Sequence, residues 1–271
     1  MVEPDAELVL VAGDPVAGTG SGSAGRQRFT LLVLADGYPA ARLDEFADRV
    51  DLFCHSLFRA EPFDRLRRLV SVYRLDRPDP PGSAGLHARF SERAGGRAGR
   101  LLTLDVAAAR QRADAALPGA DMVLVQCDRA EYGGSGGEIA VFSAHPRAVE
   151  IALHEMGHTA FGLGDEYDYP AADDQPDDVG ADPFPVEPPF PNLTVDRHPA
   201  RLKWRALVAP GTALPTTDPT VAVGAFEGGN YRRHGVYRPS ADCRMRTIGQ
   251  PFCAVCQQQI RAVLLRRCIT R

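Results

Sequence analysis

Residues 146–161 constrain the fold of this chain more than any other segment does. The segment reads PRAVEIALHEMGHTAF. It opens with a proline, which suits the first turn of a helix, and continues with closely spaced apolar residues, so it predicts a buried helix. On this helix His154 and His158 are four residues apart, so both imidazoles project from one face and can reach one ion, with Glu155 beside them. With only seven histidines in 271 residues, a chance origin for this spacing is disfavoured.

The residue types on this helix suit a catalytic zinc ion. Neutral imidazole nitrogens bind Zn²⁺ at about 2.0–2.1 Å, and a catalytic zinc site has three protein ligands and an open position for water. His154 and His158 supply two of these ligands. The Glu155 carboxylate can take a proton from water on the metal as this water attacks a peptide carbonyl, which the metal polarises. The segment therefore predicts one Zn²⁺ and a peptide or protein substrate.

A third ligand is expected just after the helix. If the helix continued, Asp165 would lie about 10 Å along its axis from His158, too far to share one ion. Gly162 and Gly164 can adopt the left-handed backbone conformation that reverses a chain, so a turn that brings Asp165 back is predicted. Glu166 is the competing ligand, and a solvated surface turn is the alternative to both. Ligands farther along the chain are less favoured but stay open, namely Glu187, His198, Glu227 and His234.

Apolar runs alternate with amphipathic segments in the amino-terminal half of the chain. The continuous runs have the length of buried strands, and the segments between them have the apolar spacing of helices. Such alternation favours an α/β fold with a twisted, mostly parallel sheet covered by helices. The expected strands are 29–35, 69–75, 122–127 and 139–142, and the expected helices are 41–60, 106–116 and 146–161.

The composition changes after the last of these helices. Aspartates and prolines crowd residues 168–191, which indicates a long irregular loop and a seam between two lobes. Residues 1–26 are expected to be a disordered or irregular lead, residues 27–164 an amino-terminal lobe with the sheet and the zinc-binding helix, and residues 165–271 a more irregular carboxy-terminal lobe. A substrate would lie in the cleft between the lobes. Calcium binding by the acidic loop is disfavoured against a solvated insertion, because its carboxylates show no regular ligand spacing.

Charge and cysteine content restrict the partners and the compartment only weakly. The formal net charge of −4 gives no reason to expect a nucleic-acid partner, and no apolar run suits a membrane span or a secretory signal. Compartment and oligomeric state stay open. The six cysteines permit disulfides, and a Cys-x-x-Cys pair with two more cysteines nearby also permits a structural metal site. The cysteines concerned are Cys243, Cys253, Cys256 and Cys268.

The sequence HEMGHTAFGLGDEY at residues 154–167 resembles the signature of the IgA-peptidase family of zinc metallopeptidases, which belongs with the metzincins. The similarity extends over about residues 27–268. Other segments that resemble the family are LLVLADGY at 31–38, YGGSGG and IAVFS within 132–143, GVYRPS at 235–240 and CRMRTIGQPFCAVC at 243–256.

This resemblance implies a metzincin-like catalytic domain that hydrolyses peptide bonds as a metalloendopeptidase. It implies three zinc ligands, a general base and a methionine in the turn beneath the metal, and it is compatible with secretion. Met245 is also the only methionine after the predicted helix. The implied ligands are His154, His158 and Asp165, the implied base is Glu155, and the implied methionine is Met245.

The sequence departs from the commonest metzincin motif, HExxHxxGxxH. Gly162 and Asp165 each come one position late, and an aspartate replaces the third histidine. This departure concerns the identity of the third ligand and not that of the first two. The immunoglobulin in the family name is not taken as the substrate of this chain.

Two other functions fit parts of the sequence. Residues 133–137 fit the G-x-S-x-G pattern of serine hydrolases with Ser135 as nucleophile. A nucleophile elbow needs a helix directly after the serine, however, and the β-like run 139–142 intervenes. The other alternative is a non-catalytic zinc-binding or peptide-binding module of the same fold. Glu155 argues against it, because a structural zinc site needs no base and normally has four protein ligands.

Residues near the predicted zinc helix are candidates for substrate contacts. The glycine-rich run 133–137 lets the backbone approach a ligand, and residues 139–142 could pair with an extended peptide by strand addition. A flexible hairpin loop is the alternative. The candidates to stabilise an oxyanion are Tyr167, Tyr231 and Tyr237, although a tyrosine in such a place is more often a half-buried packing residue.

Overall fold

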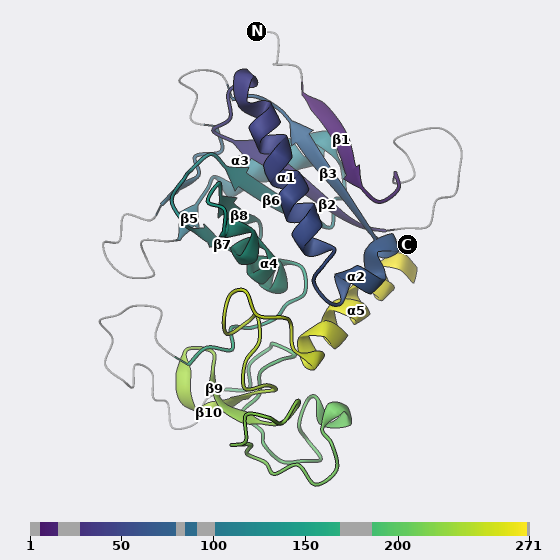
Figure 1. The fold of residues 1–271 in the computed structure, drawn as a ribbon, viewed down its shortest axis with the longest axis vertical. Coiled ribbons are helices and arrows are strands. Elements are labelled where there is room, and N and C mark those ends of the chain that lie inside the picture. Colours follow the sequence, from purple (N-terminus) through teal and green to yellow (C-terminus); the bar gives the residue numbers. More distant parts are fainter. Residues whose placement is uncertain (1–5, 16–27, 80–84, 91–100, 169–185, 270–271) are drawn as a thin grey trace.

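The structure is a computed structural model that describes residues 6–15, 28–79, 85–90, 101–168 and 186–269 (Figure 1). Helices and strands gather around a central sheet in one part of the molecule, and a second part with few regular elements lies below it in Figure 1. This arrangement confirms the prediction of an α/β fold. Most of the acidic loop expected at 168–191 lies outside the described residues, and of its aspartates only Asp168 is described, paired with Arg246 at 3.2 Å.

The central sheet of the described residues has six strands in the order β1-β3-β2-β6-β8-β7. The inner pairings β3–β2, β2–β6 and β6–β8 are parallel, whereas the two outer strands pair antiparallel with their neighbours. Near-continuous apolar runs are typical of parallel strands that are covered on both faces. The strands are β1 (Glu7–Ala12), β2 (Phe29–Asp36), β3 (Val70–Asp76), β6 (Met122–Cys127), β7 (Gly134–Ser135) and β8 (Ala140–Ser143), with β4 (Arg89–Phe90) and β5 (Leu102–Thr103) in a separate pair.

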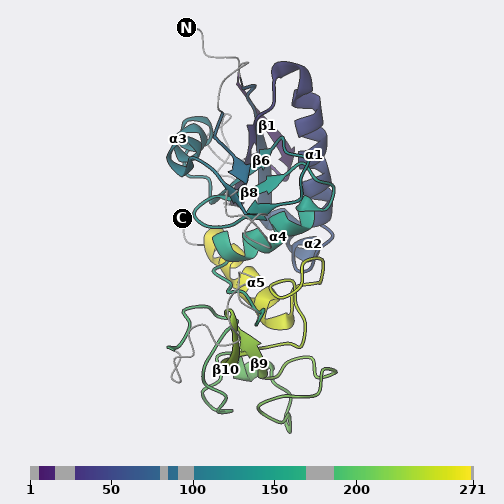
Figure 2. The same cartoon turned by 90° about the vertical axis from the view of Figure 1, so that its left-hand side faces the viewer.

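Helices cover both faces of this sheet (Figure 2). Leu31 and Val33 of β2 pack toward one face, and Leu32 and Leu34 pack toward the other. The first face carries α1 (Leu43–Leu57), α2 (Phe63–Leu66), α4 (Ala148–Thr159) and α5 (Ala254–Ile269), and the second carries α3 (Val106–Ala116). Within the described ranges, no helix combines the length and the apolar character that crossing a bilayer requires.

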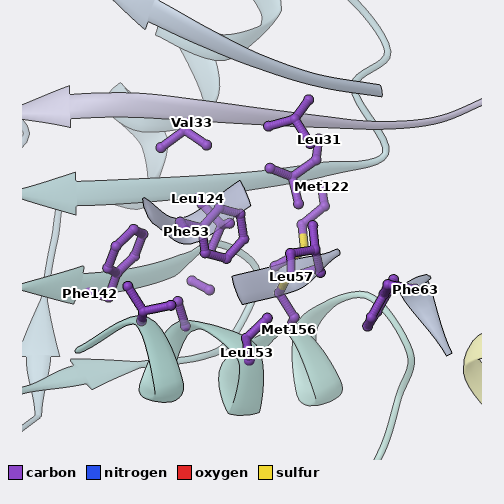
Figure 3. Packing of buried hydrophobic residues seen from close by; sticks show 14 of the residues in the cluster. Leu31, Val33, Phe53, Leu57, Phe63, Met122, Leu124, Phe142, Leu153 and Met156 are labelled. Atoms are coloured by element: carbon purple, nitrogen blue, oxygen red, sulfur yellow. The ribbon is translucent and has the colours of Figure 1, made fainter. Parts of the chain in front are cut away.

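The larger core lies between the sheet and helices α1 and α4. In Figure 3, Phe53 and Leu57 from α1 approach Leu153 and Met156 from α4, beneath strand residues such as Leu124. Each of these side chains is at most 1% exposed, and burial of a side chain of this size contributes about 1.5–3 kcal/mol. The packing holds one face of α4 against the sheet, which fixes the direction in which its other face points.

Glycines allow the terminal strand β7 to lie close to α4. A Cβ atom at Gly134 would meet Ile151 Cγ2 at 2.6 Å, and one at Gly136 would meet Glu155 Oε2 at 2.5 Å. The glycine-rich run therefore brings the backbone directly over the helix that carries the two histidines.

The prediction that residues 139–142 offer a free strand edge is wrong. These residues largely form β8, which pairs with β6 on one side and with β7 on the other. The terminal strand is β7, which is too short and too rich in glycine to be recognised from its own sequence pattern.

The second part of the molecule contains one β-hairpin, formed by β9 (Phe226–Gly229) and β10 (Arg232–Arg238). Its turn residues Asn230 and Tyr231 have φ angles of 52° and 63°. Two positive φ angles are typical of a type I′ hairpin turn, but they are uncommon for a tyrosine. A small hydrophobic core around Trp204 supports the hairpin. The short helix η4 (Arg205–Leu207) directly follows Trp204 in sequence.

Both ends of the described chain return to the central sheet. Residues 7–12, which were expected to belong to an irregular lead, form β1 and pair with β3, because Leu8 and Leu10 pack on the core beneath α3. At the other end, α5 brings Ile260 and Leu264 into the core of α1 and α4. The last helix therefore packs with the sheet, although it follows the irregular part in sequence.

Candidate metal centre

Helix α4 carries two histidines whose rings meet. The ring centroids of His154 and His158 are 4.8 Å apart, and their Nε2 atoms are 3.2 Å apart. His154 is buried, with 5% of its surface exposed, and His158 is half-buried. The four-residue spacing thus aims both imidazoles at one point.

The hydrogen bonds of the two rings define which nitrogen atoms are free to bind a cation. His154 Nδ1 donates to the carbonyl of Arg244 at 2.9 Å, and His158 Nδ1 donates to the carbonyl of Leu163 at 2.7 Å. A carbonyl only accepts, so each neutral ring carries its proton on Nδ1 and has a lone pair on Nε2. Such outer hydrogen bonds are typical of histidines that bind metals.

The chain reverses after α4 and brings Asp165 to the two rings. Gly162 adopts a φ of +62° and its N–H donates to the carbonyl of His158 at 3.1 Å. Asp165 Oδ1 lies 3.2 Å from His154 Nε2 and 3.1 Å from His158 Nε2. The glycine-driven reversal expected from the sequence is therefore present.

We call His154, His158 and Asp165 the His–Asp centre. Their converging nitrogen and oxygen atoms suit a bound cation better than they suit direct contact with one another. Three lone pairs converge, and Asp165 Oδ1 is a buried oxygen without a hydrogen-bond donor among the described residues. Leaving such an atom unsatisfied costs about 1–3 kcal/mol or more. The ligand atoms lie within 4.8 Å of one another, close enough for one metal ion, and two imidazoles with one carboxylate are a typical donor set for a catalytic zinc ion.

Charge interactions favour a positive charge in the His–Asp centre. Burial alone would lower the pKa of His158, but a protonated ring would donate a hydrogen bond to the negatively charged Asp165, and this outweighs burial and raises the pKa of His158 to about 9. Burial would raise the pKa of Asp165, but the hydrogen bonds and charges that the two histidines supply when protonated hold this pKa well below its usual value. The carboxylate therefore stays ionised, and either a proton or a metal ion balances it.

Two tyrosines hold the other oxygen of Asp165. The hydroxyls of Tyr167 and Tyr231 donate to Asp165 Oδ2 at 2.8 and 2.5 Å. Burial and the Asp165 charge raise the pKa of both tyrosines, which keeps them protonated as donors. The N–H of Asn230 also donates to the Asp165 carbonyl at 2.8 Å. The hairpin turn with its strained Tyr231 thus orients Asp165. Tyr237, the third tyrosine considered, lies elsewhere, with its hydroxyl accepting from Arg197.

Glu155 lies beside the His–Asp centre under the glycine-rich loop. Burial raises its pKa, although the charges of His154 and His158 act in the opposite direction. A carboxyl group with a raised pKa binds a proton more readily at neutral pH, as a general base must.

Two adjoining cavities open the His–Asp centre to the surface. One of about 320 Å³ extends toward Tyr132 and Ile248, and the other, of about 390 Å³, extends toward Phe190 and Tyr231. Both are lined by Glu155. Together they form a groove that passes the centre and is bordered by the backbone of β7.

Met245 lies beneath α4. A Cβ atom at Gly157 would meet Met245 Sδ at 2.5 Å, so the helix and the methionine touch. Met245 is fully buried, in a turn in which the N–H groups of Arg246 and Thr247 both donate to the Cys243 carbonyl at 2.8 Å. Met245 therefore lies in a turn that packs against the helix of His154 and His158.

The more distant ligand candidates do not reach the His–Asp centre. Glu187 pairs with Lys203 at 2.8 Å, and Glu227 pairs with His234 at 3.6 Å. The imidazole of His198 accepts from its neighbour Ala200 within a loop.

Ser135 makes a contact that does not suit a nucleophile. It lies in β7, and its hydroxyl donates to the carbonyl of Leu102 at 2.5 Å. The chain continues from it into β8 and not into a helix, so the nucleophile elbow of a serine hydrolase is not formed.

Glu166, the competing ligand, points away from the His–Asp centre. It lies with three cysteines in a second group, which we call the Cys–Glu cluster and which has ligand atoms within 4.8 Å of one another. The described cysteines form no disulfide, and Cys268 lies outside the cluster. The members of the Cys–Glu cluster are Glu166, Cys243, Cys253 and Cys256.

Sequence reasoning missed three features of this region. It did not place Glu166 among the cysteines, it did not assign Tyr167 and Tyr231 to the orientation of Asp165, and it did not single out Gly136 as the neighbour of Glu155. The only available signal was the short distance in sequence between Asp165, Glu166 and Tyr167, which makes shared positioning plausible.

The fold and the centre define an α/β protein with a buried histidine–carboxylate site that opens on a groove. The IgA Peptidase M64 family matches residues 19–222 and 217–264. The chain therefore belongs to the IgA peptidase M64 family and is a peptidase, which confirms the resemblance noted in the sequence. A search of the curated proteins finds no match to this chain.

Proposed function

We propose that this peptidase is a zinc-dependent metalloendopeptidase with a metzincin-like site. One Zn²⁺ would be held by His154, His158 and Asp165, and Glu155 would act as the general base. The observation that carries the proposal is the convergence of two Nε2 lone pairs and the unsatisfied Asp165 Oδ1 on one point.

Each residue of the site has a separate task in this proposal. When bound, Zn²⁺ supplies a Lewis acid that polarises the scissile carbonyl and acidifies water. Glu155 accepts a proton from the attacking water and passes it to the leaving amine, a use for which its raised pKa is suited. Tyr167 and Tyr231 keep Asp165 in place through Oδ2. Tyr167 also lines both cavities, but its single hydroxyl proton is donated to Asp165 and not to the groove.

The substrate is proposed to be a peptide or protein that lies in the groove beside β7. An extended peptide there would run between the glycine-rich backbone and the second part of the molecule, close to Glu155. Backbone hydrogen bonds to a terminal strand recognise many sequences, so an endopeptidase with modest side-chain selectivity is expected. Residues 27–164 and 165–271 would supply the two sides of this groove.

The proposal differs in its consequences from a non-catalytic module and from a serine hydrolase. A structural site would not need the Glu155 carboxylate at the groove, and a serine enzyme would not place the Ser135 hydroxyl on a backbone carbonyl. Both alternatives are therefore outcomes of the experiment below and not separate proposals.

The test combines bound zinc with turnover of a fluorogenic peptide library. Glu155→Ala should keep the zinc and lower hydrolysis by about 10²–10⁴-fold, whereas His158→Ala should lose both. His55→Ala, which removes an exposed histidine on α1, serves as a control that should leave both properties unchanged. Ser135→Ala, which removes a hydroxyl at the groove but keeps the backbone of β7, should keep the zinc and most of the turnover.

Three results would overturn the proposal. Near-wild-type turnover by Glu155→Ala would remove the general base. Zinc bound by the wild-type protein without turnover of any library member would favour the module. Loss of turnover in Ser135→Ala with zinc retained would favour the serine hydrolase.

A further inference from the structure

Among the described residues, Glu166 has a fully buried carboxyl group that is only partly hydrogen-bonded. It is 0% exposed, and Oε1 accepts from Asn192 Nδ2 at 2.9 Å and from Cys256 Sγ at 3.3 Å. Oε2 is buried without a hydrogen-bond partner among the described residues. A buried carboxylate oxygen left in this state is costly unless a cation is present.

We infer that the Cys–Glu cluster is a second metal site of the protein, which holds a thiophilic divalent cation such as Zn²⁺ in a structural role. Three cysteine sulfurs and one carboxylate oxygen offer four ligands, all within 4.8 Å of one another. Four protein ligands without an open position are characteristic of structural zinc, and thiolates select Zn²⁺ over Mg²⁺ or Ca²⁺.

The distances in the cluster suit a tetrahedral site. Cys243 Sγ and Cys256 Sγ are 3.8 Å apart, and a tetrahedron with zinc–sulfur bonds of about 2.3 Å has an edge of about 3.8 Å. Cys253 Sγ lies 4.0 Å from Glu166 Oε1. The backbone N–H of Cys253 donates to Cys243 Sγ at 3.2 Å, an interaction that stabilises a thiolate. Binding of the cation would displace the thiol protons to solvent.

Within the described ranges, no arginine or lysine forms an ion pair with the Glu166 carboxylate. Arg238 is buried, but its guanidinium donates to the carbonyls of Glu227, Gly228 and Ser240. Arg246 Nη1 reaches the backbone carbonyl of Glu166 at 3.1 Å and not its carboxylate.

A disulfide would satisfy the cluster less well than a metal. A bond between Cys243 and Cys256 would join two of the sulfurs and would leave Cys253 and the Glu166 carboxylate as they are. One ion bound by all four side chains would account for their convergence.

A metal ion in the Cys–Glu cluster would stabilise the segments that position the His–Asp centre. The N–H of Glu166 donates to the carbonyl of Met245 at 2.8 Å, and the neighbouring Arg244 carbonyl accepts from His154 Nδ1. Cys253 and Cys256 lie at the start of α5, which packs with the sheet. A metal here therefore fastens the segment with Asp165 to the Met245 turn and to the sheet, without contact with a substrate.

The test measures metal content and metal ligands by elemental analysis and X-ray absorption on the full-length protein. Wild type should contain two zinc ions per chain, with sulfur neighbours at about 2.3 Å. The double variant His154→Ala/His158→Ala should keep one zinc with sulfur neighbours. Cys253→Ser/Cys256→Ser should lose that zinc, and Cys268→Ser, which changes a cysteine outside the cluster, should keep both.

Because the cysteine variant could fail to fold, Glu166→Gln provides a second measurement. The glutamine keeps the shape of the side chain and an oxygen for Asn192 but removes the charge, so the second zinc should be lost more readily to a chelator. Cobalt substitution of His154→Ala/His158→Ala should also give the absorption of a thiolate–cobalt complex, without recourse to a cysteine variant.

The outcomes separate this inference from the proposed function. A wild-type protein with one metal and no sulfur neighbours would overturn the second site and leave the His–Asp centre standing. A disulfide between cluster cysteines, found by mass spectrometry after alkylation, would also overturn it. If instead the wild type and the histidine double variant contain the same single sulfur-bound zinc, the second site stands and the zinc peptidase fails.

Discussion

Two adjacent acidic residues of this protein serve two different sites. The Asp165 carboxylate reaches the His–Asp centre, and the Glu166 carboxylate reaches the Cys–Glu cluster. Consecutive side chains of an extended segment project in opposite directions, so one short segment after α4 places a carboxylate in each group. The comparison teaches that the two adjacent acids do not compete for one site, because their carboxylates lie in different groups.

The two sites differ in number of ligands, in ligand chemistry and in access. The His–Asp centre offers three nitrogen and oxygen atoms as possible ligands, and the side chain of His158 is 23% exposed toward a groove. The Cys–Glu cluster offers four possible ligand atoms, three of them sulfur, and Glu166 and Cys256 are 0% exposed. An accessible site with an open position suits chemistry, and a closed site suits stability.

Both sites nevertheless depend on the same turn. Cys243 belongs to the cluster, the Arg244 carbonyl orients His154, and Met245 packs under α4. This shared support predicts that changes in the turn affect both sites, whereas changes in one set of ligands affect one site only.

The largest expected effect comes from brief treatment with a chelator. Activity should fall to the background level while one zinc ion per chain stays bound, because the chelator reaches the exposed His–Asp centre before the buried Cys–Glu cluster. The measurement follows zinc content and peptide turnover in the same samples over time, and added zinc should restore turnover. Loss of both ions at one rate would break the distinction between an open and a closed site.

Asp165→Asn should lower peptide turnover by more than about 100-fold, since it removes a charged ligand, and changes one step farther from a metal already cost about 10–100-fold. Zinc content should drop by one ion per chain, with the sulfur-bound ion retained. Asp48→Asn on the exposed face of α1 is the control. If Asp165→Asn kept both ions and its turnover, the His–Asp centre would need another third ligand.

Tyr231→Phe should weaken zinc binding or turnover by about 10–100-fold, because it removes the 2.5 Å hydrogen bond to Asp165 Oδ2. The Cys–Glu cluster should be unaffected. Tyr237→Phe, which removes a hydroxyl that contacts Arg197, is the matched control. Equal effects of the two variants would show that the tyrosine acts through packing and not through Asp165.

The apolar periodicity of the sequence was sufficient to predict most of the central strands and the helices that cover them. The strands β2, β3 and β6 and the helices α1, α3 and α4 were expected at nearly their observed positions, because buried parallel strands and amphipathic helices have strong apolar patterns. Strand β1 was missed, since Glu7–Ala12 is a short edge strand in a polar context. The glycine-rich β7 and the late helix α5 gave no clear signal, and their places depend on tertiary contacts.

The part of the candidate site that depends on residues close together in sequence could be predicted. His154, Glu155 and His158 follow from the helix period, and Asp165 follows from a reversal at Gly162 that the structure contains. The contacts of Tyr231 with Asp165 and of Glu166 with Cys256 join residues 66 and 90 positions apart. No spacing rule predicts such contacts, because they depend on how the second part of the chain packs on the first.

The smallest expected effect belongs to Met245→Leu. Leucine has nearly the same volume, and such exchanges in a core usually cost less than about 1.5 kcal/mol, so both zinc ions should stay bound and turnover should fall by less than about tenfold. Gly157→Ala is the informative partner, since its Cβ would lie 2.5 Å from Met245 Sδ and should disturb α4 more than the leucine does. Thermal unfolding and turnover should be measured on both. A folded Met245→Leu protein with two zinc ions but no turnover would show that the thioether has a role beyond support of the turn. The turn would then do more for the two sites than hold their residues in place.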